Sequence, residues 1–112
     1  MEVKTIAVIG AGVAGRAIAY LALRSGYRAI LEDVSIDRLD QGVARIHEQL
    51  KALVAQKRFT REQKQEALQR LATSRSIEDA CREADLLIEA APEELEVKLE
   101  IFTLFDKFSK PH

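Results

Sequence analysis

The sequence predicts an α/β fold, built on a partial doubly wound parallel sheet of about four strands. Three observations lead to this prediction. Short apolar segments of strand character alternate with helical patterns, a glycine-rich turn follows the first of these segments, and a long helical hairpin follows the second. The chain has 112 residues, so we expect a single partial domain over residues 1–112 and no second domain.

The four expected strands cover residues 3–9, 28–33, 72–75 and 85–89. The first reads V-K-T-I-A-V-I and the last D-L-L-I-E, and such apolar runs are typical of parallel strands covered on both faces. Two short connections are also expected to be helical. Residues 13–24 form an Ala- and Leu-rich helix that ends at Ser25-Gly26, and residues 76–83 form a brief helix beginning at Ser76.

The segment after the second strand predicts an inserted helical hairpin. Its first helix, expected over residues 35–57, carries one apolar seam in which steps of four and three residues alternate: Leu39, Val43, Ile46, Leu50 and Leu53. The sequence Thr60-Arg61-Glu62-Gln63 then has the pattern of a capping box, which predicts the start of a second helix.

The C-terminal segment predicts a last helix over residues 92–108. Pro92 suits a first helical position, and Glu93 and Glu94 complement the helix dipole in the first turn. Apolar side chains would cover more than half of this helix. Because no fifth strand is expected, the fourth strand would be an open apolar edge, and we expect the chain to self-associate through this edge and the last helix.

The composition excludes several classes of protein. Lys and Arg number 17 against 18 Asp and Glu, so a net charge of -1 gives no general attraction to nucleic acid or an anionic membrane. No apolar run approaches the ~20 residues of a membrane span, and the N-terminus lacks the pattern of a signal peptide. Cys81 is the single cysteine, so neither a disulfide framework nor a cysteine metal cluster is expected. We therefore predict a cytoplasmic setting.

A glycine-rich motif identifies the expected ligand site. The G-x-G-x-x-G pattern follows an apolar strand, opens a helix, and is formed by Gly10, Ala11, Gly12, Val13, Ala14 and Gly15. Gly10 would allow a tight turn, Gly12 would let a pyrophosphate approach the backbone, and Gly15 would let the helix pack against the sheet. The helix N-terminus would bind the diphosphate, which indicates a Rossmann-type dinucleotide site.

An acidic residue at the end of the second strand favours one cofactor. Asp33 would accept hydrogen bonds from the adenine-ribose hydroxyls and repel a 2′-phosphate, and Glu32 would strengthen that repulsion. NAD is therefore predicted over NADP. Two alternatives remain open, because flavoproteins use the same fingerprint for FAD and because a glycine-bearing turn can exist without a ligand.

Three stretches of the chain resemble the NAD-binding domain of L-3-hydroxyacyl-CoA dehydrogenases: I-A-V-I-G-A-G-V-A-G-R-A-I-A-Y, E-D-V-S, and A-D-L-L-I-E-A-A-P-E-E-L-E-V-K. The resemblance covers essentially the whole chain, including the long hairpin, although Ala14 stands where the family often has Met. It implies an oxidoreductase of fatty acid metabolism, in which the full-length enzyme moves a hydride between NAD and a 3-hydroxyacyl-CoA.

The resemblance also implies further contacts. Glu93 and Lys98 match a Glu and a Lys that approach the nicotinamide side of the cofactor, although a first-turn helix acid and a solvated lysine would look the same. The hairpin would help to hold coenzyme A, with Lys57 favoured because it lies near the turn. The other candidates are Arg45, Lys51 and Arg58. For all four residues, Lys57 included, a solvated helix face is the favoured explanation.

No catalytic residue is expected in this chain. In the family, a His–Glu pair assisted by a Ser and an Asn performs the chemistry, and all four follow the point at which this sequence stops. His47 and His112 are expected at the surface, and Cys81 is expected to be a small helix-face residue rather than a nucleophile. Two other interpretations remain: a related dehydrogenase of small hydroxy acids that are not CoA esters, and a non-catalytic nucleotide-binding or interaction module.

Overall fold

The computed structural model describes residues 2–90 and 97–100. They form a sheet with the strand order β3-β2-β1-β4-β5. Its strands are β1 (Thr5–Ile9), β2 (Arg28–Glu32), β3 (Leu71–Ser74), β4 (Leu86–Ala90) and β5 (Val97–Glu100). The helices are α1 (Val13–Arg24), α2 (Ile36–Ala55), α3 (Arg61–Gln69) and α4 (Ile77–Glu83). The first four strands are parallel, which confirms the predicted doubly wound sheet.

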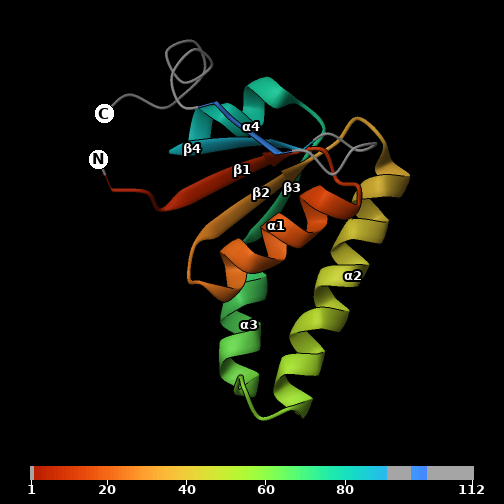
Figure 1. Cartoon of the computed structure of the whole chain (residues 1–112), viewed down its shortest axis with the longest axis vertical. Coiled ribbons are helices and arrows are strands. Elements are labelled where there is room, and N and C mark those ends of the chain that lie inside the picture. The colour runs from red at the N-terminus through yellow and green to blue at the C-terminus, as the bar shows by residue number, and fades with distance from the viewer. Residues whose placement is uncertain (1, 91–96, 101–112) are drawn as a thin grey trace.

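Helices cover both faces of the parallel strands. Successive residues of β1 alternate between the two sides. Val8 packs with the buried residues of α1 and α2, such as Leu23 and Ile46, whereas Ala7 packs with Ala80 of α4. In Figure 1, α1 and the α2–α3 hairpin accordingly lie on one side of the sheet and α4 on the other. Cover on both faces explains why the strand sequences are nearly continuous apolar runs.

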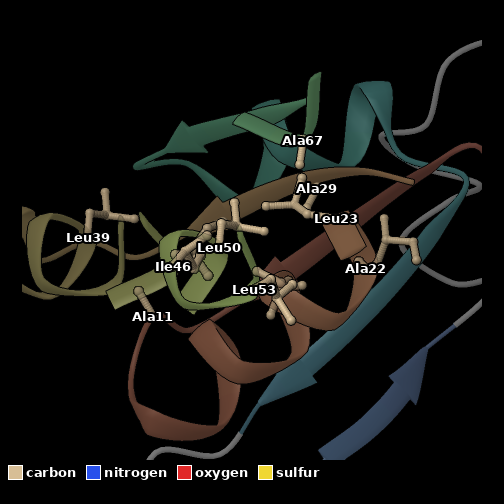
Figure 2. Packing of buried hydrophobic residues seen from close by; sticks show 13 residues of the cluster. Ala11, Ala22, Leu23, Ala29, Leu39, Ile46, Leu50, Leu53 and Ala67 are labelled. Atoms are coloured by element: carbon tan, nitrogen blue, oxygen red, sulfur yellow. The ribbon is translucent and has the colours of Figure 1, made fainter. Parts of the chain in front are cut away.

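The predicted hairpin is present, and its seam faces the core. Four of its five seam residues are buried (Leu39, Ile46, Leu50 and Leu53), and Figure 2 shows Ile46, Leu50 and Leu53 close together between α1 and the sheet. The second helix begins with the predicted capping box. The backbone N–H of Gln63 donates to Thr60 Oγ1 at 3.1 Å, and the backbone N–H of Thr60 donates to Gln63 Oε1 at 2.8 Å.

Two predictions about the C-terminal segment are wrong for the residues that the structure describes. Val97–Glu100 is a strand rather than part of a helix, and it pairs antiparallel with β4, so the edge of β4 is not open. The sequence V-K-L-E alternates with the period of a strand, and pairing satisfies backbone groups that the β4 edge would otherwise leave unpaired. The expected self-association through that edge therefore loses its basis. The rest of the predicted helix, 92–96 and 101–108, lies outside the described residues.

In the described segments, no helix is both long enough and apolar enough to cross a bilayer.

Candidate functional site

The turn between β1 and α1 has a backbone that requires glycine at its first position. Gly10 has φ +101°, a left-handed conformation that side chains disfavour. A Cβ on Gly10 would also lie 2.8 Å from the carbonyl oxygen of Ala90 at the end of β4. The backbone N–H of Gly10 donates to the carbonyl oxygen of Glu32 at 2.7 Å. The turn is therefore fixed against the ends of both neighbouring strands.

The third glycine of the motif allows α1 to approach this turn. Gly15 is buried, and a Cβ there would lie only 1.6 Å from the carbonyl oxygen of Gly10. No side chain could be accommodated at this position without moving the backbone. The role that the sequence predicted for Gly15, close packing of the helix, therefore takes the form of direct contact with the backbone of Gly10.

The N-terminus of α1 offers free donors at the end of the turn. Gly12 is the N-cap residue, without a side chain to cap the helix, and no acidic residue occupies the first turn. The first N–H groups of a helix have no partner within it, so they can bind an anion. Val13 is 64% exposed at this end, and Ala14 follows it in the same turn. The arrangement suits a diphosphate.

Asp33 lies directly beside the glycine turn. Its Oδ2 accepts the backbone N–H of Ala11 at 2.9 Å, and its Oδ1 accepts the backbone N–H of Ser35 at 2.9 Å. The guanidinium of Arg38 donates to both oxygens, from Nε to Oδ2 at 2.9 Å and from Nη2 to Oδ1 at 3.0 Å. The structure therefore brings the predicted ribose acceptor and the predicted phosphate turn together as one hydrogen-bonded unit.

The two adjacent acids at the end of β2 are in opposite electrostatic situations. Burial by itself would raise the pKa of Asp33, but the hydrogen bonds from Arg38, Ala11 and Ser35 outweigh it and lower that pKa to about 2. Burial, together with the charge of Asp33, raises the pKa of Glu32. Asp33 is therefore a firmly ionised acceptor, whereas Glu32 is only 3% exposed.

Two residues that support this site were missed by the sequence reasoning. Arg38 pairs with Asp33. The sequence signal for this role was a cation in the first turn of α2, where the helix dipole disfavours positive charge. Gly42 lets α2 pack closely, because a Cβ there would lie 3.1 Å from Leu31 Cδ2 and 3.5 Å from the carbonyl oxygen of Ala11. The signal was a glycine within a helical pattern.

Among the residues that the family resemblance added, those that the structure describes do not form part of this turn. Glu93 lies outside the described residues. Lys98 lies on β5, opposite Glu89 of β4 in the strand register, and not on a helix as predicted. The hairpin extends away from the sheet, and Lys57 is exposed at its far end (Figure 1). Arg45 is exposed on α2 and forms an ion pair with Glu48. His47 is also exposed, and Cys81 is buried.

Lys57 has a strained backbone at the end of α2. Its φ is +59°, and its backbone N–H donates to the carbonyl oxygen of Val54, while that of Arg58 donates to Leu53. These bonds form a Schellman motif, in which glycine is the usual residue at this position. We expect Lys57→Gly to raise the free energy of unfolding by about 1 kcal/mol, measured by urea denaturation, because glycine relieves the left-handed strain.

The matched control for this prediction is Arg58→Gly, at the next exposed position. Because the φ of Arg58 is not positive, glycine there relieves no strain and adds only freedom to the unfolded chain. A stabilisation by Arg58→Gly equal to that by Lys57→Gly would contradict this explanation.

Comparison with known proteins identifies the domain. The family model "3-hydroxyacyl-CoA dehydrogenase, NAD binding domain" matches residues 5–112. A 3-hydroxybutyryl-CoA dehydrogenase of Bradyrhizobium diazoefficiens is 42% identical over 100 residues, which cover 89% of this chain and 34% of that protein. A 3-hydroxyadipyl-CoA dehydrogenase of Escherichia coli K12 is 37% identical over 111 residues, which cover 99% of this chain and 23% of that protein.

Solved structures agree with this assignment. The crystal structure of 3-hydroxybutyryl-CoA dehydrogenase from Escherichia coli K12 has a TM-score of 0.76 and 37% identity, covering 84% of this chain and 20% of that one. A diketoreductase structure has a TM-score of 0.70 and 30% identity, covering 84% of this chain and 34% of that one. This chain thus spans about a third or less of the relatives named here. The predicted cofactor, NAD, is confirmed, and the chain belongs to the family of 3-hydroxyacyl-CoA dehydrogenase NAD-binding domains.

Proposed function

We propose that the β1–α1 turn and Asp33 hold the ADP-ribose part of NAD, and that in the whole protein this site serves hydride transfer to or from a 3-hydroxyacyl-CoA. One observation carries the proposal. The hydrogen bond from Ala11 to Asp33 Oδ2, at 2.9 Å, joins the glycine turn to the carboxylate. The fold would therefore hold the proposed phosphate site and the proposed ribose acceptor in a fixed relation to one another, which lowers the ordering cost of binding.

The residues of the turn suit a dinucleotide chemically. The diphosphate is an anion, and the uncapped N-terminus of α1 offers N–H donors and the positive end of a helix dipole. The turn can present its backbone there because Gly10 and Gly15 have no Cβ. A Cβ at either position would collide with a neighbouring carbonyl oxygen. Asp33 is ionised well below neutral pH, so it can accept hydrogen bonds from ribose hydroxyls.

The role of this chain in the reaction would be to bind the cofactor and to orient it. The bound cofactor would supply the hydride acceptor for oxidation of the hydroxyl-bearing carbon of the substrate. Gly12 and its neighbours would fix the diphosphate, and Asp33 would fix the adenosine ribose, which sets the position of the remainder of the cofactor. Glu93 and Lys98 would lie toward the nicotinamide, and Lys57 would contact coenzyme A at the tip of the hairpin.

With its single cysteine buried, the protein suits the reducing cytoplasm.

The relatives suggest the class of substrate. Two of them are named for 3-hydroxybutyryl-CoA and 3-hydroxyadipyl-CoA, which are both thioesters of coenzyme A. A second candidate is a hydroxy or carbonyl compound without coenzyme A, favoured by the likeness to a diketoreductase that acts on dicarbonyl compounds. Activity of the whole protein on a 3-hydroxyacyl-CoA, but not on the same acid without coenzyme A, would favour the coenzyme A thioester as the substrate.

The proposed site predicts saturable binding of NADH to the 112-residue chain in isothermal titration calorimetry. Gly12→Val should weaken that binding more than about tenfold, because an isopropyl group would occupy the space that the diphosphate needs beside the helix N-terminus. Ala17→Val is the matched control, since Ala17 is exposed on the same helix. Failure of the folded chain to bind NADH, or equal binding by Gly12→Val, would contradict the proposal.

A further inference from the structure

The carboxylate of Asp33 has no acceptor position left for a ligand. A carboxylate offers about four lone-pair positions, and Asp33 already accepts four hydrogen bonds. Two come from the backbone N–H groups of Ala11 and Ser35, which the fold holds in place. The other two come from the side chain of Arg38. Ribose hydroxyls can therefore bind to Asp33 only by sharing or replacing the bonds of Arg38.

Arg38 is the partner that can move. Its side chain is 51% exposed, whereas that of Asp33 is 7% exposed. The helix cap does not depend on the guanidinium, because it is the backbone N–H of Arg38 that donates to Ser35 Oγ. The side chain can therefore swing away from Asp33 without disturbing the start of α2.

The charge of Arg38 affects whether the site can accept a 2′-phosphate. A free Asp33 would repel a 2′-phosphate, but a bidentate guanidinium neutralises that carboxylate, and arginine binds phosphate with the same two-pronged geometry. The N-terminus of α2, where Arg38 lies, also favours an anion. Each of these features reduces the discrimination against a 2′-phosphate that the sequence alone predicted.

We propose that Arg38 is a specificity-determining residue. Its side chain moves off Asp33 when the ribose of NAD binds there, and it pairs with the 2′-phosphate when NADP binds. Arg38 thereby reduces the preference of the site for NAD over NADP. The proposal rests on the placement of the adenosine ribose at Asp33. Arg38 is not needed for Asp33 to accept a 2′-hydroxyl, so the proposal gives Arg38 a role of its own. That role has opposite effects on the binding of NAD and of NADP.

Two small ligands test this role within the described part of the site. Adenosine 5′-monophosphate carries the free ribose, and adenosine 2′,5′-bisphosphate adds only the 2′-phosphate. We expect Arg38→Gln to weaken binding of the bisphosphate by the 112-residue chain about tenfold, while binding of the monophosphate stays equal or becomes tighter. Arg38→Lys, which keeps the charge, should retain most of the affinity for the bisphosphate.

The control is Arg82→Gln, which removes an equally exposed arginine that is ion-paired with Glu78 and Asp79 on α4. It should leave the ratio of the two affinities unchanged. An equal loss of both ligands in Arg38→Gln would indicate a merely structural role and would overturn the proposal, as would an unchanged ratio. These results are distinct from failure of the wild-type chain to bind NADH and the monophosphate, which would contradict the proposed function as well.

Discussion

Replacing Gly15 with alanine is expected to abolish NADH binding and to lower the free energy of unfolding by about 3 kcal/mol. The added methyl group would lie 1.6 Å from the carbonyl oxygen of Gly10, which is backbone and cannot rotate away. Either α1 moves off the turn or the turn itself opens, and each outcome displaces the donors at the start of the helix. Urea denaturation measures the loss of stability, and calorimetric titration with NADH measures the loss of binding.

Gly26→Ala provides the matched control for Gly15→Ala. Gly26 follows the other end of α1 with φ +96°, and a Cβ there meets nothing within 4 Å. The substitution should cost about 1 kcal/mol through backbone strain alone and should leave NADH binding unchanged. A Gly15→Ala protein as stable as Gly26→Ala, with NADH binding retained, would show that α1 does not pack on the turn as described.

Asp33→Ala is expected to give the second large effect. The substitution leaves the N–H groups of Ala11 and Ser35 without their acceptor and removes the partner of Arg38. We expect a loss of about 2–3 kcal/mol in the free energy of unfolding at pH 7, together with weaker NADH binding. Asp40→Ala, at an exposed position of α2, is the control and should change neither quantity. Equal effects of the two substitutions would contradict the role of Asp33.

The pH dependence of stability isolates the charge of Asp33. Its folded-state pKa of about 2 lies below the ordinary value of 3.8, so the stabilisation is present above about pH 4 and is lost as the pH falls toward 2. It amounts to about 2 kcal/mol. The raised pKa of Glu32 acts in the opposite sense, since its contribution is present below the ordinary pKa and declines as the pH rises through the folded-state value. The difference between the wild-type and Asp33→Ala profiles should therefore shrink between pH 4 and 2, and a constant difference would contradict this assignment.

The parts of the fold that the sequence predicted correctly depend on local signals. The capping box at Thr60 and Gln63 and the glycine at the end of α1 act over a few residues. The contact between Gly10 and Gly15 is of the same kind, because a Cβ on Gly15 would meet the carbonyl oxygen of Gly10, five residues earlier in the chain. Patterns of this type can be read from one sequence, because the interacting groups are neighbours along the chain.

The errors and omissions depend on partners that are distant in sequence or on side-chain geometry. Val97–Glu100 forms a strand because the edge of β4 lies beside it, whereas the apolar periodicity of the segment also suits a helix. The pairing of Arg38 with Asp33 could not be predicted from the glycine motif, which led to the expectation of a freely repelling carboxylate. The left-handed backbone of Lys57 likewise gives no sign in its residue type.

The most direct test is an NMR titration of the ¹⁵N-labelled chain with NADH. If the glycine turn and Asp33 form the ADP-ribose site, the largest amide shifts will occur at Ala11, Gly12 and Val13 in the turn and at Ser35 beside Asp33. If these amides stay in place while the largest shifts occur elsewhere, for example along the outer side of α2 near His47, the proposed location of the cofactor is contradicted.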